Sequence, residues 1–421
     1  MGAPLSHDDV ARLHLESRDN PMTITAVLAL GAAITPAALD DLLRERLVTR
    51  PRFRDRVVEH TLAGPRWEPD DRFDLRAHVH HVGLAEPTRE ALRELVEDLA
   101  STPLDLRLPL WQAHLVTDVE GASALIVRVH HVIADGLALV DVLLGLTDEG
   151  ARGWTPPSPP RIPGGSLGAA LAPAFGLASL ALSPPEPRTA LTTHPMPHKR
   201  LAWTRDIPLA PLHDRAREWA TGVTPLLLAV TAGALRGVLR DRQDVARDLV
   251  LRAMVPLSTR SGDERSTLGN RFASVFVGLP VGLETPRERV AETDRRLRRV
   301  RVAGGVSLGR KLIHMAGSLG ASIEHLGVEL LSRRASLVVS NVPGPAERRH
   351  LGGVPLRSVV AFAPTSGEVA LGVTWFGYGG SLTAGVSAGL RDESVARDLA
   401  RHLGAECEAL TSGSGAATRK E

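Results

Sequence analysis

The chain has 421 residues, of which 43% are apolar and 23% charged, so it can bury a substantial core and is not expected to be disordered. Its 50 basic and 48 acidic residues leave a formal charge of +2 without a long basic run, which argues against a dedicated nucleic-acid surface. A single cysteine, Cys407, excludes an intramolecular disulfide and a thiolate-rich metal cluster, and it fits the cytosol.

The first half of the chain predicts a mixture of helices and strands. Three helix starts or stripes are recognisable: Ser6 with Asp9, Thr35–Pro36, and the apolar stripe from Leu92 to Leu99. Four runs have strand character: Thr23 to Leu30, Asp74 to Val82, Trp111 to Val119 and Ser123 to Val132.

A Pro-, Gly-, Ser- and Ala-rich stretch separates the two halves and is typical of a linker. It divides the chain into a first lobe, 1–154, a linker, 155–199, a second lobe, 200–410, and a frayed tail, 411–421. Each lobe is large enough for its own core.

Targeting segments are not expected. Residues 1–20 lack the charged and apolar regions of a secretory signal. The apolar stretch from Leu167 to Leu182 contains Pro173 and is shorter than a membrane span, so we expect an interlobe helix there. The predicted location is therefore cytoplasmic, with peripheral membrane association as an option.

The second half repeats the mixture of helices and strands. Helices are expected at three places: Leu226 to Leu239, Pro286 to Val300 and Val395 to Leu410. Strands are expected at four: Leu249 to Leu257, Phe272 to Pro280, Ser336 to Ser340 and Val369 to Trp375. A hairpin turn is expected from Gly377 to Gly380. Two α/β lobes of similar type predict a cleft between them, where small-molecule sites commonly form.

The sharpest local feature is HHVIADG, residues 130–136, which follows the strand-like run SALIVRV. Alternation along a strand sends His130 and His131 to opposite faces, so at most one enters a given cavity. The His131 face is apolar, and burial keeps an imidazole neutral and able to accept a proton near pH 7. The pattern predicts His131 as a general base; the alternative is a satisfied core histidine. Asp135 lies past the strand end, and Gly136 permits a close approach.

HHVIADG at a strand-to-helix junction resembles the HHxxxDG motif of chloramphenicol-acetyltransferase-like acyltransferases. Other segments resemble the bacterial wax ester synthase/diacylglycerol acyltransferase family: LSHDD at 5–9, RPRFRDR at 50–56, Pro109-Leu110-Trp111, VPLSTR at 255–260, GNRF at 269–272 and SNVPGP at 340–345. These segments occur in the expected order over nearly the whole chain. The resemblance implies an α/β (α+β) fold of two chloramphenicol-acetyltransferase-like lobes, with mixed sheets flanked by helices and an interlobe substrate tunnel.

The resemblance also implies a reaction. A fatty acyl group would pass from acyl-CoA, as co-substrate, to diacylglycerol or a long-chain alcohol, giving triacylglycerol or a wax ester, with no cofactor and no metal. His131 would be the general base and His130 would support the strand. Asp135 would be structural and turned toward an arginine, beside a structural Gly136.

Substrate contacts are expected at two places. The acyl cavity is expected to be shaped by the PLW segment, with plain core packing as the alternative: Pro109, Leu110 and Trp111. Candidates for the oxyanion donor come from the second half: Asn270, Ser340 and Asn341. The expected partners are acyl-CoA and a lipid alcohol, without nucleic acid, in peripheral contact with a membrane or lipid droplet. The sequence leaves the oligomeric state open.

The chain departs from the family pattern at one place. The family carries an Asn-Asp pair where the first helix of the second lobe opens, and Thr224 and Pro225 stand there in this chain. Thr224 as N-cap and Pro225 as the next residue suit a helix start. The runner-up function is a condensation-type or polyketide-associated acyltransferase with a carrier-bound donor. A binding protein that keeps the fold but not turnover is disfavoured by the retained His131.

Two other site types were weighed. Gly305 to Gly309 and Gly385 to Gly389 match GxSxG, but neither sits between a predicted strand and helix as a nucleophile elbow requires. His78, His80 and His81 cluster on a predicted strand without recognisable metal-ligand spacing. Neither a serine hydrolase nor a metal site is therefore expected.

Overall fold

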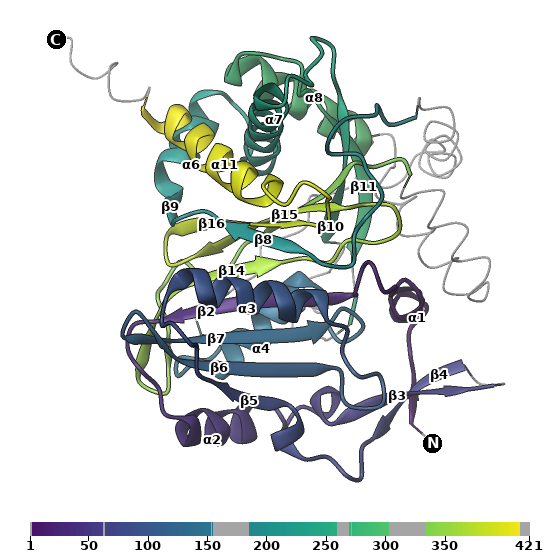
Figure 1. Ribbon diagram of the computed structural model, residues 1–421, viewed down its shortest axis with the longest axis vertical. Helices are drawn as coiled ribbons and strands as arrows, with labels where there is room; N and C mark the ends of the chain where they lie inside the picture. Colours follow the sequence, from purple (N-terminus) through teal and green to yellow (C-terminus); the bar gives the residue numbers. More distant parts are fainter. Residues whose placement is uncertain are drawn as a thin grey trace.

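The computed structural model describes residues 2–61, 64–152, 154, 185–258, 269–270, 272–302 and 333–412. Two lobes, each a β-sheet with helices packed on it, lie against each other, the first at the bottom of Figure 1 and the second at the top. The two-lobed α/β fold expected from the sequence is confirmed.

The first lobe is built on a six-stranded sheet. Its strands, in spatial order, are β13 (His350–Leu351), β14 (Val354–Phe362), β2 (Thr23–Leu30), β7 (Ala122–His130), β6 (Trp111–Val119) and β5 (Val79–Val82). Its helices are α1 (His7–His14), α2 (Pro36–Arg46), α3 (Arg89–Ser101) and α4 (Gly136–Leu146). A small sheet of β1 (Ala3–Pro4), β4 (Gly64–Pro69) and β3 (Asp55–His60) lies beside it.

Alternation along β7 determines which face of the sheet each side chain reaches. Leu125, Val127 and Val129 pack into the same core as α2 and α4. Ile126 faces the opposite side, where it joins a smaller core with residues of α3. Strand β7 is therefore buried on both faces, and its last residue, His130, is fully buried.

The second lobe is built on a mixed seven-stranded sheet. Its main strands, in order, are β11 (Phe272–Leu279), β10 (Leu251–Ser258), β12 (Leu337–Val342), β15 (Leu371–Tyr378), β16 (Ser381–Ala388) and β8 (Arg200–Trp203), and β9 (Ile207–Pro208) pairs with β16. Its helices are α6 (Leu209–Glu218), α7 (Val223–Asp241), α8 (Pro286–Val302) and α11 (Val395–Ser412), which lie together above the sheet in Figure 1. The parallel pairs β10–β12 and β12–β15 place the ends of neighbouring strands at one edge.

Helix α7 is long and apolar enough to cross a membrane by length and composition alone, but most of it is buried in the second lobe. It packs against α8 and α11. It begins at Val223 with Gly222 as N-cap, so the prediction of Thr224 as N-cap was wrong by two residues. Pro225 is tolerated because the first four backbone N–H groups of a helix have no partner within it.

One hairpin of the second half belongs to the first sheet. Strand β14 pairs antiparallel with β2 along six register pairs, from Leu356 with Leu30 to Phe362 with Thr25. Figure 1 shows β14 between the remainder of the first sheet and the second lobe. A strand from within the range 200–410 therefore covers the edge of β2 in the first sheet.

Three other boundaries differ from the expectations. Asp74 caps a short 3₁₀ turn (Leu75–Ala77), because its carboxylate accepts the Arg76 N–H, and β5 starts only at Val79. Strand β7 ends at His130, so His131 lies in the following turn. Within the predicted linker, residues 155–184 lie outside the described residues, and in the predicted tail the helix continues to Ser412.

Candidate active site

His131 lies in the tight turn that joins β7 to α4. Its backbone N–H donates to the Met22 carbonyl oxygen at 2.7 Å, which ties the turn to the start of β2. The Ile133 N–H donates to the His130 carbonyl oxygen at 3.0 Å and closes the turn. The direction of the His131 side chain is therefore set by this turn and not by strand alternation.

The His131 ring is half-buried, and its buried Nδ1 has no hydrogen-bond partner among the described residues. Its centroid lies 5.6 Å from that of Phe272, and the Arg12 guanidinium lies 4.3 Å from the centroid of the same phenyl ring. Burial lowers the pKa of His131 to about 4, and the positive charge of Arg12 contributes to the decrease. The imidazole is therefore neutral at pH 7, the state in which it can take up a proton.

His130, by contrast, has both ring nitrogens engaged. Its Nε2 lies 2.8 Å from Glu16 Oε2, and its Nδ1 accepts the Val132 N–H at 3.1 Å. The same Glu16 oxygen accepts the Met22 N–H at 3.2 Å. Since Nδ1 accepts, Nε2 must be the donor to the carboxylate. His130 thus fastens the end of β7 to the start of β2, directly behind His131.

Asp135 and Gly136 start helix α4. The Asp135 carboxylate accepts the Ala138 N–H at 2.9 Å and is the N-cap. The arginine contact implied for Asp135 stays a prediction. A Cβ on Gly136 would lie 3.2 Å from Cγ2 of Val342 in β12, tighter than nearly all real contacts of this kind. The glycine therefore lets the start of α4 approach the second lobe.

Asn270 reaches the turn that carries His131 from the second half of the chain. Its Nδ2 donates to the His131 carbonyl oxygen at 2.7 Å and to Asp9 Oδ1 at 2.8 Å. The preceding Gly269 has φ +101°, a conformation that favours glycine, and its N–H donates to the Ile133 carbonyl oxygen at 3.0 Å. Both amide hydrogens of Asn270 are thus engaged, so in this conformation Asn270 has no N–H left for an oxyanion.

Ser340 and Asn341 lie in the second half of β12. Asn341 Nδ2 donates to Thr224 Oγ1 at 3.1 Å, so the residue that departs from the family pattern is bound to the SNVPGP segment. Ser340 is buried opposite Thr374 of β15. Asn341 keeps one amide hydrogen that this bond does not use.

The PLW segment lies in the core of the first lobe. Trp111 is buried, its Nε1 donates to the Phe53 carbonyl oxygen at 2.9 Å, and its ring stacks on that of His78 at 4.8 Å. Leu110 is buried and its carbonyl oxygen accepts the His130 N–H at 2.9 Å. Pro109 precedes them on the same turn into β6. The segment therefore supports the histidine strand, which favours the core-packing alternative.

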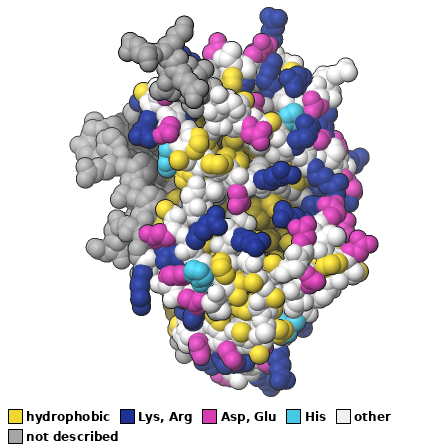
Figure 2. Space-filling model, turned by 90° about the vertical axis from the view of Figure 1, so that its left-hand side faces the viewer, with side chains coloured by type: hydrophobic (Ala, Val, Ile, Leu, Met, Phe, Trp, Pro, Cys, Tyr) yellow, Lys and Arg dark blue, Asp and Glu magenta, His cyan; other side chains and the backbone are white. Residues whose placement is uncertain are grey.

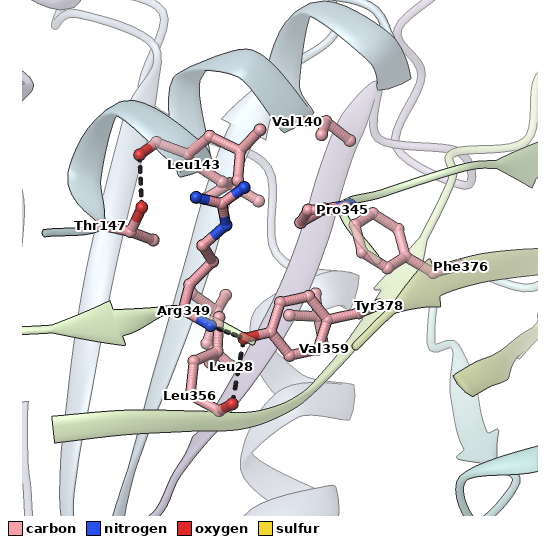
Figure 3. Close-up of a pocket in the computed structure, with 11 residues that line it drawn as sticks. Leu28, Val140, Leu143, Thr147, Pro345, Arg349, Leu356, Val359, Phe376 and Tyr378 are labelled. Carbon is pink, nitrogen blue, oxygen red and sulfur yellow. Dashed lines mark hydrogen bonds between the residues drawn. The ribbon is translucent and has the colours of Figure 1, made fainter. Parts of the chain in front are cut away.

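An apolar cavity lies along α4, beyond the helix start that Asp135 caps. It holds about 330 Å³ of empty space, counting the part open to solvent. Figure 3 shows Val140 and Leu143 of α4 on one side of it and Phe376 and Tyr378 of β15 on the other, with the Arg349 guanidinium between them. The Tyr378 hydroxyl accepts the backbone N–H of Arg349 at 2.7 Å.

The surface around the interlobe boundary is mixed in charge. On the face that Figure 2 shows, apolar side chains line a central hollow, and basic and acidic side chains are interspersed around it. This pattern differs from a continuous basic band.

The two alternative site types receive no support from the described residues. Ser387 is the penultimate residue of β16, where both neighbouring strands pair with it, through Gly372 and Leu201, and it does not lie on a strand-to-helix turn. The other GxSxG segment, 305–309, lies outside the described residues. Within the described ranges no three His, Cys, Asp or Glu side chains are grouped to hold a metal ion. His80 stacks on His114 at 4.7 Å, and burial lowers the pKa of His114 to about 3.

Sequence reasoning missed four residues that surround His131. Asp9, Arg12 and Phe272 lie within or beside the LSHDD and GNRF segments, so their motifs marked them without showing what they touch. Glu16 lies in an irregular segment between α1 and β2 and carries no local signal. Its contact with His130 arises only from the tertiary structure.

Two family models together match residues 5–410 of the chain. The sequence model of the wax ester synthase/diacylglycerol acyltransferase catalytic domain matches residues 5–303, and that of the WS/DGAT C-terminal domain matches 268–410. A probable diacylglycerol O-acyltransferase of Mycobacterium tuberculosis is 28% identical over 430 residues, covering 94% of this chain and 93% of its own.

Solved structures share the fold. The wax ester synthase/diacylglycerol acyltransferase of Marinobacter aquaeolei VT8 aligns with a TM-score of 0.72 at 22% identity, covering 97% of this chain and all of that one. The first condensation domain of the calcium-dependent antibiotic synthetase aligns with a TM-score of 0.66 at 15% identity, covering 98% and 96%. At these identities the likeness concerns the fold alone.

Proposed function

The chain belongs to the wax ester synthase/diacylglycerol acyltransferase family and is an acyltransferase, and from that membership we propose that it transfers a fatty acyl group from acyl-CoA to a lipid alcohol. The acceptor would be diacylglycerol or a long-chain alcohol, and the product triacylglycerol or a wax ester. The observation that carries this proposal is the neutral, half-buried His131 ring at the boundary of the two lobes.

In the proposed reaction, His131 takes the proton of the acceptor hydroxyl while the oxygen attacks the thioester carbonyl carbon. The tetrahedral intermediate then collapses, the carbon–sulfur bond breaks, and the protonated imidazole returns the proton to the CoA thiolate. A pKa well below 7 keeps the ring free of protons at the start of each turnover. General-base catalysis of this kind contributes about 10²–10⁴-fold to the rate.

The oxyanion of the intermediate needs a hydrogen-bond donor. Asn270 is the weakest of the three sequence candidates because its two amide hydrogens already bind His131 and Asp9. We therefore propose that the donor is the Ser340 hydroxyl or the amide hydrogen of Asn341 that Thr224 does not use. Replacing each by alanine should lower kcat more than it raises KM.

We propose that the apolar cavity along α4 receives the distal part of an acyl chain. Its lining is aliphatic and aromatic apart from Thr147 and Arg349, as a hydrocarbon chain requires. Val140→Phe would fill it from the side of α4, and we expect the preferred acyl-CoA to become shorter. An unchanged chain-length preference would place the acyl group elsewhere.

The test uses labelled long-chain acyl-CoA with diacylglycerol and fatty alcohols, and product separation by thin-layer chromatography. His131→Ala should lower kcat at least a hundredfold. His81→Ala is the matched control, because this half-exposed histidine of the same lobe is bound to Asp40, outside the site. Equal product formation by wild type and His131→Ala would overturn the catalytic assignment.

A parallel assay with acyl groups on a carrier protein distinguishes the proposed reaction from that of a condensation-type or polyketide-associated acyltransferase. The shared fold with a condensation domain makes this control necessary. Faster turnover with the carrier-bound donor than with acyl-CoA would favour the condensation-type reaction.

We also propose that the enzyme works in the cytoplasm in peripheral contact with a membrane or lipid droplet, where its acceptors dissolve.

A further inference from the structure

Two segments that are far apart in sequence, 6–9 and 269–270, converge on the backbone of His131. The Ser6 hydroxyl donates to Asp9 Oδ2 at 2.7 Å, and Asp9 Oδ1 accepts Asn270 Nδ2 at 2.8 Å. The same Nδ2 donates to the His131 carbonyl oxygen at 2.7 Å. Asp9 and Asn270 are both more than nine-tenths buried, so water does not replace these bonds easily.

The chemistry of the partners determines which way the Asn270 amide faces. A carboxylate and a backbone carbonyl are acceptors only, so the group that meets both must be the NH₂ and not the oxygen. With Asp9 in place, a flipped amide would set oxygen against oxygen at two contacts. The amide oxygen, Oδ1, is left buried and without a hydrogen-bond partner among the described residues.

We propose that Asp9 is a positioning residue for the transfer reaction. It orients the Asn270 amide, which then holds the His131 carbonyl and, through Gly269 bound to Ile133, the turn from which the imidazole projects. The proposal rests on the acyl transfer assigned to His131 above. It gives the LSHDD segment a role in the site although Asp9 touches neither the imidazole nor a reacting atom.

The first part of the test separates the two bonds that Asn270 makes. Asn270→Asp puts a carboxylate where an amide donated, so it loses the bond to His131 and repels Asp9. We expect kcat to fall at least tenfold and the melting temperature to drop. Asp9→Asn should be mild, within about threefold in kcat, because its amide oxygen can still accept from Asn270.

The double variant Asp9→Asn/Asn270→Asp decides between a positioning and a merely structural role. Asn at position 9 can donate to Asp at 270, so we expect the melting temperature to recover toward that of wild type. The His131 carbonyl still faces an acceptor, so kcat should stay at least tenfold low. Recovery of kcat together with stability would overturn the proposal, as would an unchanged kcat in Asn270→Asp.

A control and an activity-independent readout complete the design. Asp41→Asn makes the same substitution at an exposed aspartate of α2, which pairs with Arg44, and should leave both kcat and stability near wild type. Carbethoxylation of His131 by diethyl pyrocarbonate, mapped by mass spectrometry, should change in rate in Asn270→Asp and in the double variant but not in Asp41→Asn. If wild type transfers no acyl group, the proposed function fails, while an unchanged carbethoxylation rate specifically refutes the positioning role.

Discussion

His130 and His131 are adjacent in sequence but occupy different environments. His130 ends β7, is fully buried and has both nitrogens bound, to Glu16 and to the Val132 N–H. His131 lies in the next turn, keeps Nδ1 unbound and has a lowered pKa. His130 therefore holds two strands together, whereas the neutral His131 ring can still accept a proton. In this pair, hydrogen-bond saturation separates the histidine that holds the strands together from the one proposed as general base.

The largest expected difference comes from exchanging each histidine for alanine. His130→Ala removes the Nε2 donor to the Glu16 carboxylate, which then keeps the Met22 N–H, and leaves a buried cavity, which should cost about 3 kcal/mol of unfolding free energy. His131→Ala removes a ring with no such partner and should cost within about 1 kcal/mol, while activity is lost. Urea unfolding together with kcat measurement checks both. A stability loss at His131 as large as that at His130 would break the comparison.

The pH dependence sharpens the same contrast. With a pKa of about 4, His131 stays neutral above pH 5, so kcat/KM should be flat from pH 8 to 5 and fall about tenfold for each unit below 4. An ordinary histidine would lose its base function already near pH 6.5. Circular dichroism at each pH shows that the protein remains folded. A rate that halves near pH 6.5 would contradict the lowered pKa.

The same pKa also predicts a change in stability. Between pH 6.5 and about 4 the unfolded chain binds a proton at His131 that the folded protein does not, so this residue lowers stability as the pH falls through that range. In His131→Ala this contribution disappears, and the difference in unfolding free energy between variant and wild type should therefore depend on pH. A constant difference would show that the folded and unfolded pKa values are equal.

The family and the elements named in the sequence analysis were predictable because they rest on local patterns and motifs, whereas others, such as α6 and β14, were missed. Strand β2 and the start of α2 at Pro36 follow from β-branched alternation and an N-cap with proline. The pairing of β14 with β2 and the reach of Glu16 to His130 were not predictable. Both depend on contacts between segments more than 100 residues apart, for which one sequence holds no local signal.

Within the site, motifs located the residues but not their roles. Asn270 was one of three candidates for the oxyanion donor, and its amide binds the His131 carbonyl and Asp9. For Trp111 the sequence left an acyl cavity and core packing as alternatives, and the side chain packs in the first core. A motif marks a position that the family uses, and only the geometry of its partners shows whether that use is chemical or structural.

Trp111 extends the comparison to the core face next to the histidines. Trp111→Phe removes the bond from Nε1 to the Phe53 carbonyl oxygen and part of a fully buried ring, which should cost about 2 kcal/mol. The position pairs with Val129 of β7 and lies on the core side, so kcat and chain-length preference should remain near wild type. A shifted preference for acyl-chain length at unchanged stability would indicate that the PLW segment lines the acyl cavity.

The smallest effect is expected at Thr224, where the chain departs from its family. Thr224→Val keeps the shape but removes the acceptor of the Asn341 N–H, which should cost about 1 kcal/mol. If Asn341 supplies the oxyanion donor, its amide then becomes free to turn, and kcat should change while KM for acyl-CoA does not. Thr224→Ser keeps the hydroxyl and should behave as wild type. Equal kcat in all three proteins would leave Ser340 as the oxyanion donor, because the bond from Asn341 to Thr224 would then have no influence on the reaction.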